Sequence, residues 1–311
     1  MAHDIFYRTS KDNNCTCLRR NNKVGTSFNL MEFKHLKSIL EKHNLWAKKS
    51  LGQHFLTDES VCQRMVQHLN LKDQTIVEVG PGPGSLTDIL LKTDARFLMC
   101  IEKDKRFIDI LKEFESPTNT AFTIVQADAL NVSIPALLRE QGHLEPYHIV
   151  ANLPYNIGTE LLIRWIGDVE HIHSITVMLQ REMVDRMTAQ VDTKEYGRLA
   201  ILLQSCFEVQ EVFQIPPEAF IPPPKVWSSV AYLKPLKQIP EAGVLKTLGK
   251  LTNMAFSHRR KMLRASLGKS LPVPLWRKLC DTLDIDETKR PEQLDTSTFL
   301  AMAQICNKEL I

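Results

Sequence analysis

The chain lacks the long apolar segments and the cysteine spacing that define several large classes of protein. Among its 311 residues, no apolar run approaches the ~20 residues needed to span a bilayer. The amino terminus has no apolar core and no small-residue cleavage site, which argues against a secretory signal. The seven cysteines are odd in number and follow no framework, so we expect reduced thiols and a cytoplasmic location. Cys15 and Cys17 form a single Cys-x-Cys pair, short of the four ligands of a structural zinc site.

Charge is distributed unevenly along the chain. The net charge of +3 is the sum of +6 in residues 1–50, −7 in residues 51–240 and +4 in residues 241–311. An acidic middle with basic ends favours contact of the ends with a polyanion. Solvated helix faces and a disordered leader explain the same charges equally well.

The order of apolar patterns predicts an α/β fold. Residues 1–30 are polar and Asn-rich, which predicts a disordered extension, and residues 32–47 have the spacing of a short helix. Further along, helical patterns alternate with short apolar runs, as in a parallel, doubly wound sheet with right-handed crossovers. The predicted strands cover residues 75–79, 97–101, 122–126, 148–151 and 175–179.

The last third of the chain changes character. Two late strands are predicted at 207–213 and 226–233, and the proline-rich loop 216–224 between them should lie outside the sheet. From residue 241 onward the pattern is helical. We therefore predict three parts, which are the extension 1–30, an α/β domain over 31–240 and a small helical domain over 241–311.

The segment Asn-Leu-Pro-Tyr follows the fourth predicted strand and groups three recognition elements at one edge of the sheet. The Asn152 side-chain oxygen and the Leu153 carbonyl can accept the two hydrogens of an amine, while Tyr155 offers a ring for stacking. Pro154 has a fixed φ and no N–H, which stiffens the turn. This pattern predicts a site for the amine of an adenine. The structural alternatives are a strand-end cap for Asn152 and a packed core aromatic for Tyr155.

A glycine-rich turn and two acids predict a nucleoside cofactor. Gly-Pro-Gly-Pro-Gly at 80–84 follows the first strand, but it has neither the spacing of a dinucleotide fingerprint nor the lysine of a P-loop. Glu102 ends the second strand, where an acid usually binds ribose hydroxyls. Asp128 follows the third strand and can accept from the amino group of a cofactor adenine. Taken singly, each acid could instead be a helix cap or a solvated loop residue.

Seven motifs occur in an order that identifies a family resemblance. They lie at residues 51–56, 78–82, 101–104, 128–129, 152–157, 217–226 and 256–261. Together they resemble the KsgA/RsmA family of ribosomal RNA adenine dimethyltransferases, over roughly residues 46 to 303. The resemblance implies a class I methyltransferase fold in residues 31–240, with S-adenosylmethionine as cofactor and no metal. By position, the implied cofactor-binding residues are His54, Leu56, Gly80, Gly82, Glu102, Asp128 and Asn152. Family members often carry Asn where this chain has His54.

The same resemblance implies the reaction. The exocyclic amine of adenine is a poor nucleophile because its lone pair is delocalised, and the two acceptors at Asn152 and Leu153 favour its attack on a sulfonium methyl. Tyr155 should stack on one face of the base and Phe220 on the other, unless Phe220 is a packing residue. The implied product is N6,N6-dimethyladenosine at two adjacent adenosines in the 3′-terminal hairpin of 16S small-subunit rRNA, formed during ribosome biogenesis.

Basic residues near the carboxyl terminus predict contact with RNA phosphates. Arg259, Arg260, Lys261 and Arg264 lie in a predicted helix, in which Arg260 and Arg264 share a face. Lys48 and Lys49 lie close to the first motif and should add to the contact. A solubilising helix face is the alternative. The expected partner is the immature 30S subunit, with no membrane contact and a monomeric enzyme.

Two rival functions remain at this stage. A 23S rRNA adenine methyltransferase of the resistance type shares the Asn-x-Pro-Tyr site but tends to lack the His-Arg-Arg-Lys pattern. A non-catalytic RNA-binding assembly factor would have a damaged cofactor site, whereas Gly80, Glu102, Asp128 and Asn152 are all present here.

Overall fold

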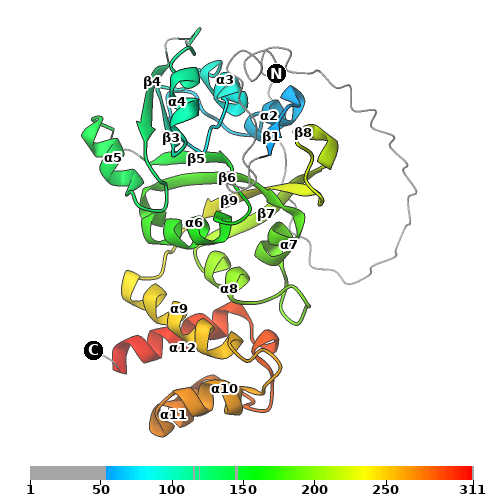
Figure 1. Ribbon diagram of the computed structural model, residues 1–311. Coiled ribbons are helices and arrows are strands. Elements are labelled where there is room, and N and C mark those ends of the chain that lie inside the picture. Colours follow the sequence, from blue (N-terminus) through cyan, green and yellow to red (C-terminus); the bar gives the residue numbers. More distant parts are fainter. Residues whose placement is uncertain (1–53, 115, 119, 144–145, 310–311) are drawn as a thin grey trace, which may run out of the picture. The chain divides into compact units, whose positions relative to one another are not determined.

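The computed structural model describes residues 54–309 apart from residues 115, 119, 144 and 145. Its centre is a seven-stranded sheet with the order β4-β3-β2-β5-β6-β9-β7 (Figure 1). The strands are β2 (Thr75–Val79), β3 (Phe97–Glu102), β4 (Ala121–Gln126), β5 (Tyr147–Asn152), β6 (Ile172–Gln180), β7 (Phe207–Ile215) and β9 (Ser228–Pro235). The strands β4, β3, β2, β5 and β6 are parallel to one another. Strand β9 lies between β6 and β7 and is antiparallel to both. The predicted doubly wound α/β fold is confirmed.

Helices cover both faces of this sheet. They are α2 (Glu59–Val66), α3 (Ser85–Leu91), α4 (Lys105–Leu111), α5 (Ile134–Glu140), α6 (Gly158–Trp165), α7 (Arg181–Thr188) and α8 (Arg198–Gln204), with short 3₁₀ helices at η2 (Ile166–His171), η3 (Pro217–Ala219) and η4 (Pro291–Gln293). Every residue of β2 and β3 is buried, as expected for central strands with helices on both sides. Helix α2 begins where the Asp58 side chain accepts from the Ser60 N–H at 2.9 Å.

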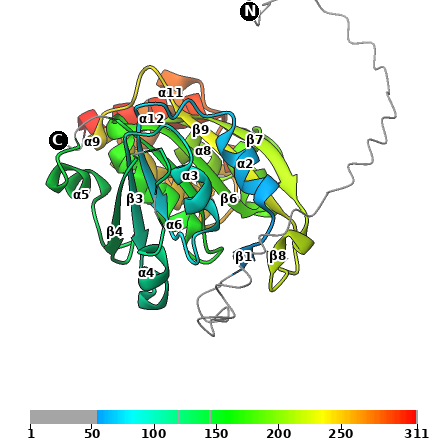
Figure 2. The same cartoon turned by 90° about the horizontal axis from the view of Figure 1, so that it is seen from above.

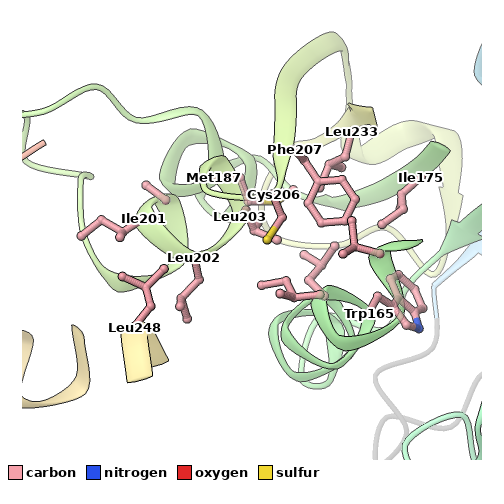
Figure 3. Packing of buried hydrophobic residues seen from close by; sticks show 14 of the residues in the cluster. Trp165, Ile175, Met187, Ile201, Leu202, Leu203, Cys206, Phe207, Leu233 and Leu248 are labelled. Carbon is pink, nitrogen blue, oxygen red and sulfur yellow. The ribbon is translucent and has the colours of Figure 1, made fainter. Parts of the chain in front are cut away.

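Apolar cores lie on both faces of the sheet. On one face, Val61 and Met65 of α2 share a cluster with Ile76 of β2 and Val150 of β5. On the other face, Trp165 of α6 and Leu203 of α8 share a cluster with Phe207 of β7 (Figure 3). The second core continues past α8, because Leu248 lies next to Leu202 in the same cluster (Figure 3).

The chain is helical from residue 242 onward, as the sequence pattern predicts. The helices are α9 (Ala242–Phe256), α10 (Leu263–Ser270), α11 (Val273–Leu283) and α12 (Thr296–Glu309). Leu251, Leu267, Leu279 and Phe299 supply one buried residue from each helix to a shared apolar cluster. This packing gives the four helices a common interior.

Three local features differ from the sequence expectations. Residues 257–262 form a turn between α9 and α10, so the predicted helix carrying Arg259 to Arg264 is wrong. Helix α5 was not predicted, although Ser133 caps it and Pro135 stands in its first turn, where proline is tolerated. A second, two-stranded sheet joins β1 (Phe55–Leu56) to β8 (Phe220–Ile221), and Figure 2 shows the pair beside each other.

Several predictions fall on residues that the structure does not describe. They are the extension over 1–30, the helix within 32–47, the Cys15–Cys17 pair, and the RNA contacts of Lys48 and Lys49. Within the described residues, no helix has the length and apolar character required to cross a membrane.

Candidate active site

A cavity of about 410 Å³ lies at the carboxyl ends of the parallel strands. Val79, Glu102 and Asn152, which end β2, β3 and β5, are among the residues that line it. This is the edge at which open α/β sheets bind ligands, and the volume is in the range of small-molecule sites, roughly 300–1,000 Å³. Every described residue of the predicted catalytic and cofactor sets except Phe220 lines this cavity.

The glycine turn brings the backbone close to the strand that carries Asn152. Gly80 and Gly82 have φ angles of +70° and +55°, a region in which residues with a Cβ are strained. A Cβ on Gly80 would stand 3.9 Å from the backbone oxygen of Asn152. The predicted cofactor turn and the predicted transfer residue are therefore neighbours in space.

Glu102 is held by two backbone donors. Its carboxylate oxygens accept from the Gly82 N–H at 2.9 Å and from the Asp104 N–H at 2.7 Å. The side chain is 7% exposed, and burial raises its pKa. Because each carboxylate oxygen keeps a further lone pair, this fixed acid can still accept from two vicinal hydroxyls such as those of a ribose.

Asp128 presents a second acceptor at the end of β4. It accepts from the Leu130 N–H at 3.0 Å and pairs with the Lys103 ammonium group at 2.7 Å. The hydrogen bond from Lys103 lowers the pKa of Asp128. Two carboxylates at the ends of neighbouring strands suit a ligand that offers hydroxyl and amino donors and carries a positive charge, which fits S-adenosylmethionine.

The Asn152–Tyr155 segment is rigid. The Leu153 N–H donates to the Met178 carbonyl of β6 at 3.2 Å, and the Pro154 carbonyl accepts from the N–H groups of Ile157 and Gly158 at 3.2 Å. The Tyr155 hydroxyl and the Ser228 hydroxyl are 2.7 Å apart. These contacts hold the backbone of the segment and the Tyr155 ring in place.

His54 packs against the same segment. Its ring stacks on Tyr155 with a centroid distance of 5.7 Å, and its Nδ1–H donates to the Pro222 carbonyl at 2.7 Å. Burial raises the pKa of Tyr155, so the phenol stays protonated at neutral pH. The Tyr155 ring is therefore a neutral stacking surface held on one side by His54.

The residues around this cavity are part of a sequence pattern shared with known enzymes. Residues 31–308 match the profile that describes ribosomal RNA adenine dimethylases. The chain belongs to the ribosomal RNA adenine dimethylase family. It is a methyltransferase with S-adenosylmethionine as its methyl donor, as the order of motifs predicts.

Curated relatives in this family cover most of the chain. The ribosomal RNA small subunit methyltransferase A of Azorhizobium caulinodans is 42% identical over 274 residues, which span 86% of this chain and 91% of that protein. The protein of the same name from Brucella abortus is 41% identical over 276 residues, which span 87% and 96% of the two chains.

Two solved structures share the fold at 25% identity. A dimethyladenosine transferase from Plasmodium falciparum has a TM-score of 0.68 and covers 83% of this chain and 99% of its own. The 23S rRNA methyltransferase ErmE has a TM-score of 0.60 and covers 81% of this chain and 98% of its own. The class I methyltransferase fold is thereby confirmed.

Phe220 occupies a different place from the one predicted in this dimethylase. Its ring is 1% exposed and packs in the apolar cluster that contains Leu56 and Val230. The pairing of Leu56 with Phe220 in the two-stranded sheet turns the ring toward this core. Phe220 therefore has the packing role that was the alternative in the sequence analysis, and it does not face the cavity.

The predicted RNA-contact residues divide into two groups. The Arg259 guanidinium donates to the backbone carbonyls of Thr193, Lys194 and Tyr196, the last at 2.8 Å. It fastens the turn after α9 to the loop before α8. Arg260, Lys261 and Arg264 are exposed like Arg259, but their side chains have no such contact with the backbone of the described residues. The structure therefore separates a positioning arginine from three cations that face solvent.

Glu78 is a cavity residue that the sequence analysis did not single out. It is 1% exposed and accepts from the Thr87 hydroxyl at 2.6 Å and the Cys100 thiol at 3.3 Å. Burial raises its pKa from 4.5 to about 7. A carboxylate inside the otherwise apolar strand 75–79 is the signal that could have identified it, because acids are rarely fully buried.

Proposed function

We propose that this dimethylase transfers methyl groups to N6 of two adjacent adenosines in the 3′-terminal hairpin of 16S small-subunit rRNA. The observation that carries the proposal is the single cavity shared by the glycine turn, the acids Glu102 and Asp128, and the Asn152–Tyr155 segment. A site for a nucleoside-type donor and a site for an adenine amine thus adjoin. The relatives that match over most of the chain are named as small-subunit methyltransferases, which supports the choice of rRNA.

Asn152 and Leu153 act on the amine by accepting its hydrogens. Asn152 Oδ1 and the Leu153 carbonyl draw both hydrogens toward the rim of the sheet, which frees the nitrogen lone pair for attack. Bound S-adenosylmethionine supplies the electrophilic methyl group. The fixed dipoles stabilise the positive charge that develops on the nitrogen, and no strong base is required. The rate also depends on how the rigid segment orients the base.

Tyr155 holds the base by stacking. His54 covers one side of the ring, so the target adenine stacks on the opposite side. The hydrogen bond with Ser228 fixes the ring orientation. A base–aromatic stack of this kind contributes about 1–3 kcal/mol.

A neutral amide in this position explains dimethylation. Asn152 accepts a hydrogen bond whether the substrate nitrogen carries two hydrogens or one hydrogen and one methyl group. The same site can therefore bind the monomethylated product again. A second transfer then needs loss to water of the proton that the first transfer leaves on the nitrogen, a new molecule of S-adenosylmethionine, and room for one more methyl group.

The helical part over residues 241–311 supplies RNA contacts in this proposal, and residues 31–240 hold the cofactor. Arg260, Lys261 and Arg264 present exposed positive charge to phosphates. A second cavity of about 520 Å³ nearby has lining residues of both charges, which are Arg186, Lys194, Arg198 and Arg259 together with Glu182 and Glu195. We take the substrate particle to be the immature 30S subunit and the enzyme to act as a cytoplasmic monomer.

A subunit-selective methylation assay tests the proposal. Full-length protein is incubated with methyl-labelled S-adenosylmethionine and, separately, with small and large ribosomal subunits that lack the modification. We expect label in small-subunit rRNA alone. Label in 23S rRNA alone would support the resistance-type alternative, and no label with either subunit would support the non-catalytic assembly factor.

A further inference from the structure

Residues 221–227 form an exposed apolar segment, called here the rim segment. Ile221, Val226 and Trp227 are each more than two-fifths exposed, and Trp227 is 47% exposed. The two other tryptophans that the structure describes, Trp165 and Trp276, are buried. Isolated exposed apolar residues are ordinary, but three in one short segment that includes an indole suggest a contact surface.

The rim segment is attached at both ends to residues that line the methyl-transfer cavity. Near its beginning, the Pro222 carbonyl accepts from His54 Nδ1–H at 2.7 Å. Directly after its end, the Ser228 hydroxyl lies 2.7 Å from the Tyr155 hydroxyl. His54 and Tyr155 both line the cavity. The rim segment therefore lies beside the cavity.

Strand register places Trp227 at the same edge of the sheet as Asn152. Asn152 pairs with Met178 in β6, and two residues further along β6 Gln180 pairs with Ser228 in β9. Trp227 comes immediately before this pair, at the carboxyl end of β6. Ser228 at the start of β9 is fully buried, whereas Trp227, just outside the strand, is exposed.

The backbone of Trp227 is fixed, and positive charge lies close to it in the chain. Its carbonyl accepts from the Arg181 N–H at 2.9 Å, at the start of α7. The Arg181 side chain is half exposed and forms an ion pair with Asp185 at 3.9 Å, whereas Lys225, two residues before Trp227, is exposed. An exposed indole with an exposed lysine two residues away in the chain has the chemistry of a nucleotide site, in which the ring stacks on a base and the cation meets a phosphate.

We propose that Trp227 stacks on the nucleobase adjacent to the adenosine that occupies the cavity, and so positions the RNA strand for transfer. This inference rests on the proposed function. Its occupant is an unpaired nucleotide of the rRNA substrate. When one adenosine of the pair is against Tyr155, its neighbour is held on the indole at the cavity edge.

The proposal makes Trp227 a positioning residue with a distinct kinetic signature. Losing one base–aromatic stack, worth about 1–3 kcal/mol, weakens binding by about 5- to 150-fold. We therefore expect Trp227→Ala to raise KM for unmethylated small subunits by about that factor. We expect the Kd for S-adenosylmethionine and the melting temperature to stay as in the wild type. Trp227→Phe should restore most of the lost affinity, and Trp227→Leu should not.

A direct stacking probe completes the test. The ligand is the 3′-terminal rRNA hairpin with 2-aminopurine in place of the base beside one target adenosine, since 2-aminopurine loses fluorescence when it stacks. The full-length wild type should quench the probe, Trp227→Ala should not, and Trp227→Phe should quench partly. Val273→Ala and Leu236→Ala change exposed apolar residues outside the rim segment and serve as matched controls that should behave as the wild type.

The outcomes separate this inference from the proposed function. One outcome is that the wild type methylates small subunits and that Trp227→Ala has the same KM and the same quenching as the wild type. That outcome would overturn the inference and leave the proposed function intact. A raised KM on intact subunits with unchanged quenching of the hairpin would also overturn it, because Trp227 would then contact a ribosomal protein. Failure of the wild type to methylate small subunits would contradict the proposed function itself.

Discussion

Asn152 is the residue on which the proposed chemistry depends most. It ends β5, lines the cavity, and its backbone oxygen lies next to the glycine turn. Its side chain carries no charge at any physiological pH, so it can hold an amine without removing a proton. The peptide that joins Asn152 to Leu153 is held by the hydrogen bond from the Leu153 N–H to the Met178 carbonyl of β6.

Removing the Asn152 side chain should slow the chemical step much more than it weakens cofactor binding. We expect Asn152→Ala to lower kcat by about 10²- to 10³-fold, the size of effect seen when one fixed dipole is removed from an active site. The Kd for S-adenosylmethionine should rise by a far smaller factor. Single-turnover methylation with an equilibrium binding assay measures both. Asn253→Ala, which alters an exposed asparagine of α9, is the control, and equal rates in the two variants would refute the assigned role.

Glu78 should give the stability of this protein an uncommon pH dependence. Its pKa is raised by burial to about 7 in the folded state, from an ordinary value of 4.5. The folded state therefore binds this proton more tightly than the unfolded state does. The resulting stabilisation is fully present below about pH 4.5 and is lost as the pH rises to about 7.

The isosteric variant Glu78→Gln removes this titration. The free energy of unfolding of the wild type, relative to that of Glu78→Gln, should fall between pH 5 and pH 8. Denaturant titrations of both proteins at the two pH values measure the difference. Parallel pH profiles would show that Glu78 does not titrate in this range.

At the scale of single elements, the glycine turn imposes the strictest backbone requirement. Gly84 precedes α3 with a φ of +95°, and a Cβ placed on it would lie 2.6 Å from Cζ of Phe114. We expect Gly84→Ala to lower the free energy of unfolding by about 1–3 kcal/mol through backbone strain, and to displace Phe114. Thermal or denaturant unfolding tests this value. Gly167→Ala meets no neighbouring atom within 4 Å and should be nearly neutral, so equal losses in both variants would argue against a local effect.

Some elements of the fold can be predicted from sequence patterns, whereas others cannot. The strands β2, β3 and β4 are mostly apolar, and their position and length are visible without tertiary information. The acids Glu102 and Asp128 could be assigned to one edge because parallel strands all end on the same side. The direction of the Phe220 ring could not be predicted, because it follows from pairing with β1, more than 160 residues earlier in the chain.

The turn over residues 257–262 could not be predicted from the local sequence either. Arg260, Lys261 and Met262 are good helix formers, so the local sequence favours a helix through this region. In the structure, the Leu263 N–H donates to the Lys289 carbonyl at 2.8 Å and the Arg264 N–H to the Glu287 carbonyl at 3.0 Å. These donors would otherwise continue α9. Contacts with a distant segment therefore override the local preference.

At the scale of the whole molecule, the turn after α9 is both a connection and a contact surface. Arg259 binds the loop before α8, while Arg260 and Lys261 remain exposed. We expect Arg259→Ala to cost about 1 kcal/mol of stability, the net value of an ordinary hydrogen bond. It should also speed proteolysis of the loop over residues 189–197. Limited proteolysis followed by mass analysis measures this change.

The neighbouring cations should behave in the opposite way. Arg260→Ala combined with Lys261→Ala should leave stability and proteolysis unchanged. The double variant should weaken RNA binding and reduce the dependence of log Kd on log salt concentration by about one unit for each lost phosphate contact. An unchanged salt slope in the double variant would remove these residues from the RNA surface.

In the proposed reaction, a single cavity of the enzyme joins a methyl donor to the amines of two adjacent adenosines in small-subunit rRNA. Mass mapping of rRNA from unmethylated small subunits, after incubation with full-length protein and S-adenosylmethionine, tests it most directly. The account predicts N6,N6-dimethyladenosine at two neighbouring positions of the 3′-terminal hairpin, and its absence with the Asn152→Ala variant. Methyl groups confined to large-subunit rRNA, or only monomethylated adenosine at exhaustive reaction, would contradict the account.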